Sequence, residues 1–491
     1  MTAPARQRTA WLGAVWLLRF AAAFLLLNLL LTFENRWPGL GVRSMPRLSF
    51  ELCLGVLALT GWVAWRGGVS ARAASWLAVG ALLCGALRYI DVTAQAVFGR
   101  PLNLFWDGAH AADVLELALQ SVAWWQIAAA LALMLLGLGV LYRLARWAIA
   151  TLAECLAWRA PRPVLLTAGL ALTLSFAAYQ PGRDTRWFFS LPLSPTVAHQ
   201  LAMLPAALWP ERSGAALSSS PAFTGNVARL HGADVLLLFA ESYGVTSLDD
   251  PAKASALQAA REHFAQAVQA SGRSMVSARV RSPTFGGASW LAHAGLLSGV
   301  DTHDPHHNDL LLASQRPTLV RHFALHGYRT VGWMPGLQRP WPEGSFYGFD
   351  RVAGANDIGY AGPAFGYWRV PDQAAMALLH AQELAGAVSE RAPRFIVFPT
   401  LNTHAPFRPL PPYLADWSRA ARADAYNAEQ YAAALAAEVS WQNAALPYID
   451  SLRYQFDWLA GYLSQRAPRK LVLIVVGDHQ PLAAVSGPNA S

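Results

Sequence analysis

Residues 471–479 read LVLIVVGDH, a run of six apolar residues followed by a glycine and an Asp-His pair. A continuous apolar run of this length is typical of a strand that is buried on both faces of a sheet. Residues 235–240 (VLLLFA) and 395–398 (FIVF) have the same character, and residues 328–333 form a fourth candidate strand. These runs predict the buried strands of one sheet.

Helical spacing separates the predicted strands. We expect helices over residues 251–270 and 372–389, and a long helical region over 428–464. Alternation of strands and helices is the signature of an α/β domain with a mainly parallel sheet. We expect this domain to occupy residues 223–491.

Three of the predicted strands are followed at once by side chains that bind metals. Glu241 follows the first strand, His404 follows the strand at 395–398, and Asp478 and His479 follow the last. In an open parallel sheet, ligands bind at the carboxyl ends of the strands. Each residue alone could be a helix cap or a surface histidine, but together they predict a metal-binding active site.

A hydroxyl nucleophile is expected in residues 282–293, which read SPTFGGASWLAH. This is a glycine-rich turn that enters a helix, where free N–H groups and the helix dipole favour an alkoxide and an incoming phosphate. The alternative is that a serine here only caps the helix.

The first part of the chain predicts a membrane domain. The chain has 491 residues, of which 54% are hydrophobic and 14% charged, and its mean hydropathy is +0.26. A soluble domain carries roughly 25% charged residues. We expect a domain of five transmembrane helices within residues 1–180 and a juxtamembrane connector over 181–222; the apolar stretches are 10–33, 48–65, 73–90, 121–141 and 164–179.

The charge distribution predicts the orientation and excludes one class of partner. Residues 1–180 carry 14 Arg, no Lys and 7 acidic residues, whereas residues 181–491 carry 24 basic and 23 acidic residues. The arginine bias favours a cytoplasmic N-terminus and a C-terminal domain outside the membrane. Because the C-terminal part is nearly neutral, a nucleic-acid partner is not expected.

Three polar features of the membrane part are open to two interpretations each. Arg19 and Glu51 lie in apolar stretches, where a charge either has a function or reaches toward the lipid headgroups. The aromatic loop expected at residues 91–113 could contact a lipid headgroup or act as an interfacial anchor. The three cysteines, Cys53, Cys84 and Cys155, lie in this part, so no disulfide is expected within residues 181–491.

The polar residues of the C-terminal part resemble those of the sulfatase and alkaline-phosphatase superfamily. That family has a Glu after the first strand, a Cys or Ser nucleophile in a stretch that ends Leu-Leu-Thr-Gly, and a late strand that ends in an Asp-His or similar pair. Residues 296–299 read LLSG, and their alignment on that stretch places Ser289 on the nucleophile, with Thr284 as the alternative. The arrangement of spans and domain is similar to lipoteichoic-acid synthases, phosphoglycerol transferases and lipid A phosphoethanolamine transferases.

The resemblance implies roles for individual residues. Glu241, Ser289, Asp478 and His479 would bind one divalent metal ion, with zinc favoured and manganese or magnesium as alternatives. Ser289 and His404 would be catalytic. His404, Trp341 and His293 would contact the substrate.

Several residues depart from the family pattern. Ser289 lacks the Pro-Ser-Arg continuation that directs formylglycine formation, so a true sulfatase is not expected. Met334 stands where lipoteichoic-acid synthases have a second substrate-binding histidine, which His293 or His306 could replace. The C-terminal domain lacks the cysteines of the phosphoethanolamine transferases, and the family normally has further strands after the Asp-His pair.

The resulting expectation is a multi-pass enzyme of the bacterial inner membrane with a periplasmic or extracellular C-terminal domain. It would transfer a phospho-headgroup, phosphoglycerol rather than phosphoethanolamine, from a membrane phospholipid to an envelope glycan or lipid. The alternatives are a hydrolase of the same superfamily and a non-catalytic binding module in the membrane.

Overall fold

The computed structural model describes residues 3–36, 40–98, 108, 123–177, 188–198, 200–201, 217–386, 391–440 and 443–487. The chain divides into two compact units. The helical unit consists chiefly of Met1–Gln95 and Val122–Leu204, and the α/β unit chiefly of Pro205–Ser491.

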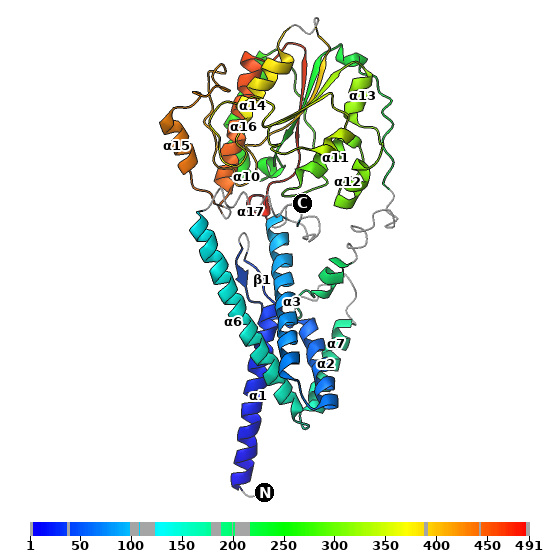
Figure 1. The fold of residues 1–491 in the computed structure, drawn as a ribbon, viewed down its shortest axis with the longest axis vertical. Coiled ribbons are helices and arrows are strands. Elements are labelled where there is room, and N and C mark those ends of the chain that lie inside the picture. The colour runs from blue at the N-terminus through cyan, green and yellow to red at the C-terminus, as the bar shows by residue number, and fades with distance from the viewer. Residues whose placement is uncertain are drawn as a thin grey trace. The chain divides into compact units, whose positions relative to one another are not determined.

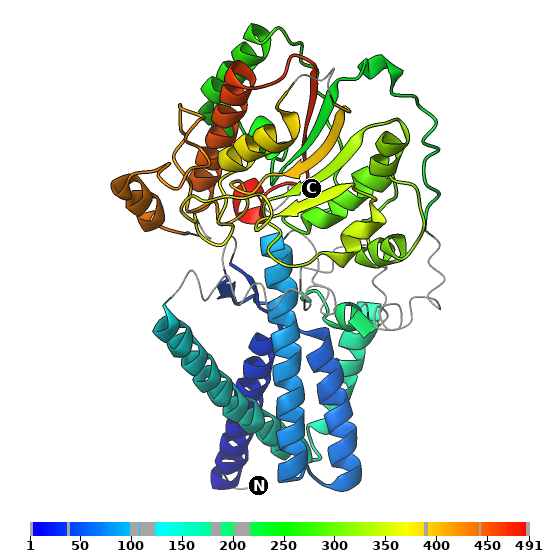
Figure 2. The same ribbon diagram turned by 45° about the horizontal axis from the view of Figure 1, so that its top comes forward.

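The helices of the helical unit follow the apolar stretches of the sequence (Figure 2). They are α1 (Ala3–Leu31), α2 (Phe50–Arg66), α3 (Ala71–Phe98), α6 (Trp124–Ala157) and α7 (Arg162–Ala177). A short antiparallel pair, β1 (Glu34–Asn35) and β2 (Val42–Arg43), follows α1. Small residues bring the helices close together: a Cβ on Gly169 of α7 would come within 2.6 Å of the Leu57 side chain of α2.

Three helices among the described residues are long and apolar enough to cross a membrane: Gly13–Leu31, Ala71–Ala96 and Trp124–Ala157. Helix α2 has 17 residues and the apolar part of α7 is shorter still, whereas a span takes about 20 residues. The helical unit therefore indicates membrane association. Five spans are not shown.

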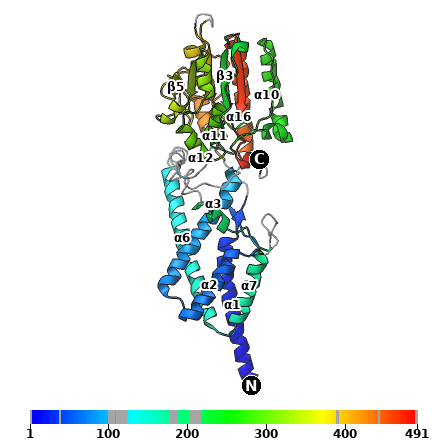
Figure 3. The same ribbon diagram turned by 90° about the vertical axis from the view of Figure 1, so that its right-hand side faces the viewer.

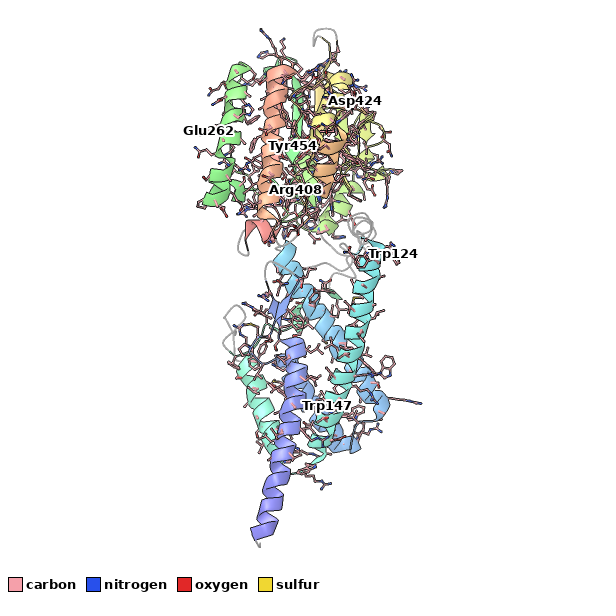
Figure 4. The ribbon with its side chains drawn as sticks, turned by 90° about the vertical axis from the view of Figure 1, so that its left-hand side faces the viewer. Trp124, Trp147, Glu262, Arg408, Asp424 and Tyr454 are labelled. Atoms are coloured by element: carbon pink, nitrogen blue, oxygen red, sulfur yellow. The ribbon has the colours of Figure 1, made fainter. Side chains whose placement is uncertain are left out.

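Helix α6 is longer than the stretch 121–141 predicted. Its 34 residues extend to Ala157, because the alanine-rich sequence after residue 141 contains no helix-breaking residue. At 1.5 Å per residue the helix is about 51 Å long, against a hydrocarbon core of about 30 Å. Trp124 and Trp147 both stand exposed on this helix (Figure 4).

The two charged residues that lie in apolar stretches, Arg19 and Glu51, have partners within the helical unit. Arg19 of α1 forms an ion pair with Glu154 of α6. Glu51 of α2 accepts hydrogen bonds from the backbone N–H groups of Leu193 and Ser194, at 2.6 and 3.1 Å. Both charges thus have a structural role.

The loop predicted at residues 91–113 begins later than expected. Residues 91–98 continue α3, and most of the rest lies outside the described residues.

The α/β unit has the predicted mainly parallel sheet, with all the strand pairings in the described sheet parallel. The strand order is β5-β4-β6-β3-β7. The predicted strands are β3 (Asp234–Ala240), β4 (Arg329–Met334), β6 (Arg394–Pro399) and β7 (Leu471–Gly477). Strand β5 (Arg351–Gly354) was not predicted, because its four residues RVAG contain no apolar run.

Helices cover both faces of this sheet (Figures 1 and 3). One face packs against α14 (Asp372–Leu379) and α16 (Ala445–Gln465), and α10 (Pro251–Ala270) packs on α16. The opposite face packs against α11 (Ser289–Ser298), α12 (Pro305–Leu312) and α13 (Leu319–Leu325). Alternate residues of β3 enter the two cores, Leu236 and Leu238 on the first side and Leu237 and Phe239 on the other.

Two predicted helices differ from the structure. The region 428–464 contains two helices, α15 (Ala428–Ala436) and α16, because Ala437 takes an extended backbone conformation that ends α15. The helix predicted at 372–389 ends earlier: α14 continues into the π-helical turn η4 (His380–Leu384), and Ala385 is extended.

Candidate metal centre and nucleophile

The order of the strands places three groups of polar side chains at one edge of the sheet. Strand β3 lies between β6 and β7, and all three run parallel. Ala240 pairs with Gly477, so the next residues, Glu241 and Asp478, emerge side by side. Gly477 is required there, because a Cβ would come within 1.9 Å of the Tyr243 carbonyl oxygen.

A glycine-rich turn delivers Ser289 to the same edge. Gly286, Gly287 and Ala288 all have positive φ, at 66°, 146° and 57°, and α11 begins at Ser289. The Gly286 N–H donates to the Gln480 carbonyl oxygen at 3.0 Å, and the Ser282 hydroxyl donates to the Asp478 carbonyl oxygen. The turn is therefore fixed against the segment that follows β7.

Ser289 does not act as the cap of this helix. The N-cap position is Ala288, which has no capping side chain, and Ser289 is the first helical residue. Its hydroxyl instead donates to Glu241 Oε2 at 2.9 Å and lies 3.0 Å from His479 Nε2. The interpretation of a simple serine cap is thus wrong.

The four predicted metal ligands lie together. Glu241, Asp478 and His479 each offer a ligand atom, and these atoms lie within 4.8 Å of one another. His479 Nε2 is 3.3 Å from Glu241 Oε1 and 3.8 Å from Asp478 Oδ1. All three residues are buried, with Ser289 Oγ at the edge of the group.

The hydrogen bonds around this cluster orient Asp478 and His479 and leave one oxygen of Asp478 without a partner among the described residues. Asp478 Oδ1 accepts from the backbone N–H groups of Ser242 and His479, at 2.8 and 2.7 Å. Asp478 Oδ2 is buried and forms no hydrogen bond among the described residues. His479 Nδ1 lies 2.7 Å from the Gln480 carbonyl oxygen, so Nδ1 carries a proton and Nε2 faces Glu241 and Ser289.

This donor set fits a divalent metal ion. A ligand histidine usually donates its other N–H to a carbonyl or a carboxylate, as His479 does. One imidazole, two carboxylates and a hydroxyl suit zinc or manganese better than calcium. Glu241, Asp478, His479 and Ser289 are the residues that would hold the ion.

The charged members of the cluster shift one another's pKa values. Burial would raise the pKa of Glu241, but His479 and His404 hold it well below its ordinary value. Burial and the neighbouring Glu241 raise the pKa of Asp478. Burial would lower the pKa of His479, but Asp478 and Glu241 raise it to about 9, so a cation would have to displace a proton from Nε2.

His404 is held close to the cluster by the loop after β6. Its charge contributes to the lowered pKa of Glu241, and its ring lies 4.6 Å from the ring of Trp368. The Nδ1 atom is 2.7 Å from the Ala405 carbonyl oxygen, which leaves Nε2 as the atom for proton exchange.

The other predicted substrate contacts are placed differently. Trp341 packs on Tyr347, with ring centroids 5.5 Å apart, against the core on the α11–α13 side of the sheet, and its contact with a substrate stays a prediction. His293 faces the cluster: its Nε2 is 3.7 Å from Asp478 Oδ2. The Thr284 hydroxyl is engaged with the Gly287 carbonyl oxygen, which favours Ser289 over Thr284 as the nucleophile.

Some residues of the site could not be recognised from sequence. Ser242 has φ of 56° and its hydroxyl donates to Glu241 Oε1 at 2.9 Å. The Thr400 hydroxyl accepts from the Glu241 N–H at 3.1 Å. Asp372, at the start of α14, accepts from the N–H groups of Leu401 and Asn402 and so fixes the loop that carries His404. In the sequence, the position of Ser242 next to Glu241 was the only indication that Ser242 belongs to the site. Thr400 and Asp372 carried no such indication.

Comparisons with protein-family models, with curated proteins and with solved structures found no match to this chain.

Proposed function

We propose that this protein is a membrane-bound, metal-dependent transferase that moves a phospho-headgroup from a membrane phospholipid to an envelope acceptor. One observation carries the proposal. The Ser289 hydroxyl, on a strained turn at the start of a helix, lies within 3.0 Å of both Glu241 and His479, beside Asp478.

Ser289 is the nucleophile. Its Oγ forms a bond to the phosphorus of the phosphodiester as the bond from phosphorus to the diacylglycerol oxygen breaks. A divalent cation held by the cluster would lower the pKa of the Ser289 hydroxyl and neutralise charge on the phosphate. The first N–H groups of α11 and the positive end of its dipole favour the same negative charge.

His404 exchanges the protons. Its Nε2 gives a proton to the diacylglycerol oxygen as this oxygen leaves, and takes one from the acceptor hydroxyl as that hydroxyl displaces Ser289. The Trp368 ring and the hydrogen bonds of Asp372 hold the loop of His404 in place for this role. The cycle starts with His404 protonated and with Ser289 as the alkoxide that a bound cation would stabilise, the hydroxyl proton having been released to solvent when the cation binds. Each half-reaction then transfers one group and one proton, and displacement by the acceptor regenerates the Ser289 alkoxide and the protonated His404.

The apolar helices support the choice of a lipid donor. Three of them have the length and composition of membrane spans. We propose five spans, a cytoplasmic N-terminus and an α/β unit outside the bacterial inner membrane, as the arginine bias suggests. Anchoring would confine donor and enzyme to one surface. The phosphoglycerol headgroup is favoured over phosphoethanolamine, because the α/β unit contains no cysteine for the disulfides of phosphoethanolamine transferases.

The test is a Ser289→Ala variant of the full chain in lipid nanodiscs that contain phosphatidylglycerol. We expect diacylglycerol release to fall at least 1,000-fold, because the covalent intermediate cannot form. Ser345→Ala, which removes an exposed hydroxyl that donates to the nearby Pro342 carbonyl oxygen, is the matched control. Mass spectrometry of the wild type should find the headgroup adduct on Ser289. Unchanged release by Ser289→Ala would refute the mechanism.

A further inference from the structure

His293 lies beside the metal-ligand cluster but is not one of its members. It sits on α11 four residues after Ser289, so that both side chains lie on one face of the helix. Its ring packs against Phe239 of β3, with centroids 4.2 Å apart. Its Nε2 is 3.7 Å from Asp478 Oδ2.

Both atoms lack a hydrogen-bond partner among the described residues, although they lie near each other. His293 Nε2 and Asp478 Oδ2 are both buried, and neither forms a hydrogen bond there. Asp478 Oδ1 already accepts from two backbone N–H groups, which occupy its two lone pairs. Oδ2 is therefore the oxygen with which Asp478 would bind a cation. His293 Nε2 lies close to this same oxygen.

Two features distinguish His293 from a direct ligand. The atoms that lie within 4.8 Å of one another belong to Glu241, Asp478 and His479, and His293 is not among this group. His479 has its Nδ1 oriented by a carbonyl oxygen, as ligand histidines usually do, whereas no such bond is described for His293 Nδ1. The 3.7 Å separation is that of an ion pair or a long N–H to carboxylate contact.

We propose that His293 is a positioning residue of the metal centre: its Nε2–H is directed at Asp478 Oδ2 and fixes the orientation of that carboxylate toward the cation. The same helix carries Ser289, so this contact also sets the distance between the nucleophile and the cluster. The inference rests on the proposed function, because it assumes that the cluster binds a divalent cation. Hydrogen bonds to ligating carboxylates typically change metal affinity 10- to 100-fold.

The experiment measures zinc affinity of the purified full chain by competition with a chelating dye, for the wild type, three variants of His293 and one control variant. We expect His293→Ala to raise the zinc Kd about 10- to 100-fold. His293→Gln should recover most of the affinity, because the glutamine amide donates from nearly the position of Nε2, whereas His293→Asn should not. His303→Ala removes an exposed histidine near the same turn and should leave the Kd unchanged.

X-ray absorption spectroscopy of the zinc-loaded chain adds a readout that does not depend on affinity. We expect one imidazole ligand in both the wild type and His293→Ala. Two imidazoles in the wild type and one in the variant would overturn the proposal, because His293 would then be a ligand. An unchanged Kd in His293→Ala, or no recovery in His293→Gln, would also overturn it while leaving the metal centre intact. Absence of zinc binding in the wild type would instead refute the proposed function, and this inference with it.

Discussion

At the scale of single residues, the sequence predicts which side chains gather at the edge of the sheet but not the direction in which each one points. Glu241, Asp478 and His479 could be predicted as a cluster, because each follows an apolar strand and parallel strands end at one edge. No comparable sequence pattern indicates the direction in which a side chain at the edge of a core points. Trp341, predicted as a lining residue, packs on Tyr347, and its contact with a substrate stays a prediction.

Also at the scale of single residues, Glu383 lies at the end of the sheet opposite the candidate site, where it links the first residues of three strands. It contacts Arg329 of β4, Arg351 of β5 and Arg394 of β6, at 3.3, 2.8 and 3.0 Å. Burial would raise the pKa of Glu383, but these arginines hold it below its ordinary value. Because the folded-state pKa is lowered, the carboxylate stabilises the fold above its unfolded-state pKa of about 4.3, and this contribution is lost as the pH falls through the folded-state value.

We expect Glu383→Gln to destabilise the α/β unit by about 2 kcal/mol at pH 7, because three arginines lose their anionic partner. Thermal unfolding of the full chain in detergent would show a lower Tm, and the difference from the wild type should shrink between pH 5 and pH 3. Glu262→Gln, on the exposed face of α10, is the control and should leave Tm unchanged (Figure 4). An equal effect of Glu383→Gln at every pH would contradict the electrostatic explanation.

At the scale of elements, long apolar or periodic segments were predicted well and their ends poorly. Strands β3, β4, β6 and β7 match the predicted runs to within a few residues, because strands buried on both faces must be continuously apolar. The four residues of β5 carry no such run. The ends of α6, α14 and α15 depend on single backbone conformations, which periodicity does not encode.

Strand β7 is the last strand of the described sheet order, and its outer edge is unpaired there. It is also continuously apolar, with Ile474 43% and Val475 36% exposed. Such an edge favours pairing with another chain, and a lysine on it opposes that pairing.

We therefore expect Ile474→Lys to reduce self-association of the detergent-solubilised chain. Sedimentation velocity at two protein concentrations would measure the change. Leu446→Lys places the same charge on an exposed position of α16, where it should have no effect. Equal self-association in the wild type and Ile474→Lys would show that the edge of β7 is not a contact surface.

At the scale of the whole molecule, composition predicted the division into two chemically different parts. The helical unit exposes apolar side chains along α6, including Leu133, Leu135 and Leu136, each at least 65% exposed. The α/β unit buries most of its apolar residues in two large cores, one on each face of its sheet, and others in smaller clusters. The number of spans could not be decided in this way, because α2 and α7 are near the minimum length.

The stoichiometry of divalent cations in the purified full chain tests the central claim most directly. After chelation and dialysis against zinc, the wild type should retain about one ion per chain by inductively coupled plasma mass spectrometry, since Glu241, Asp478 and His479 converge on one position. A Glu241→Gln, His479→Gln double variant that still folds should retain none. Equal zinc content in the wild type and the double variant, or no zinc in either, would contradict the account.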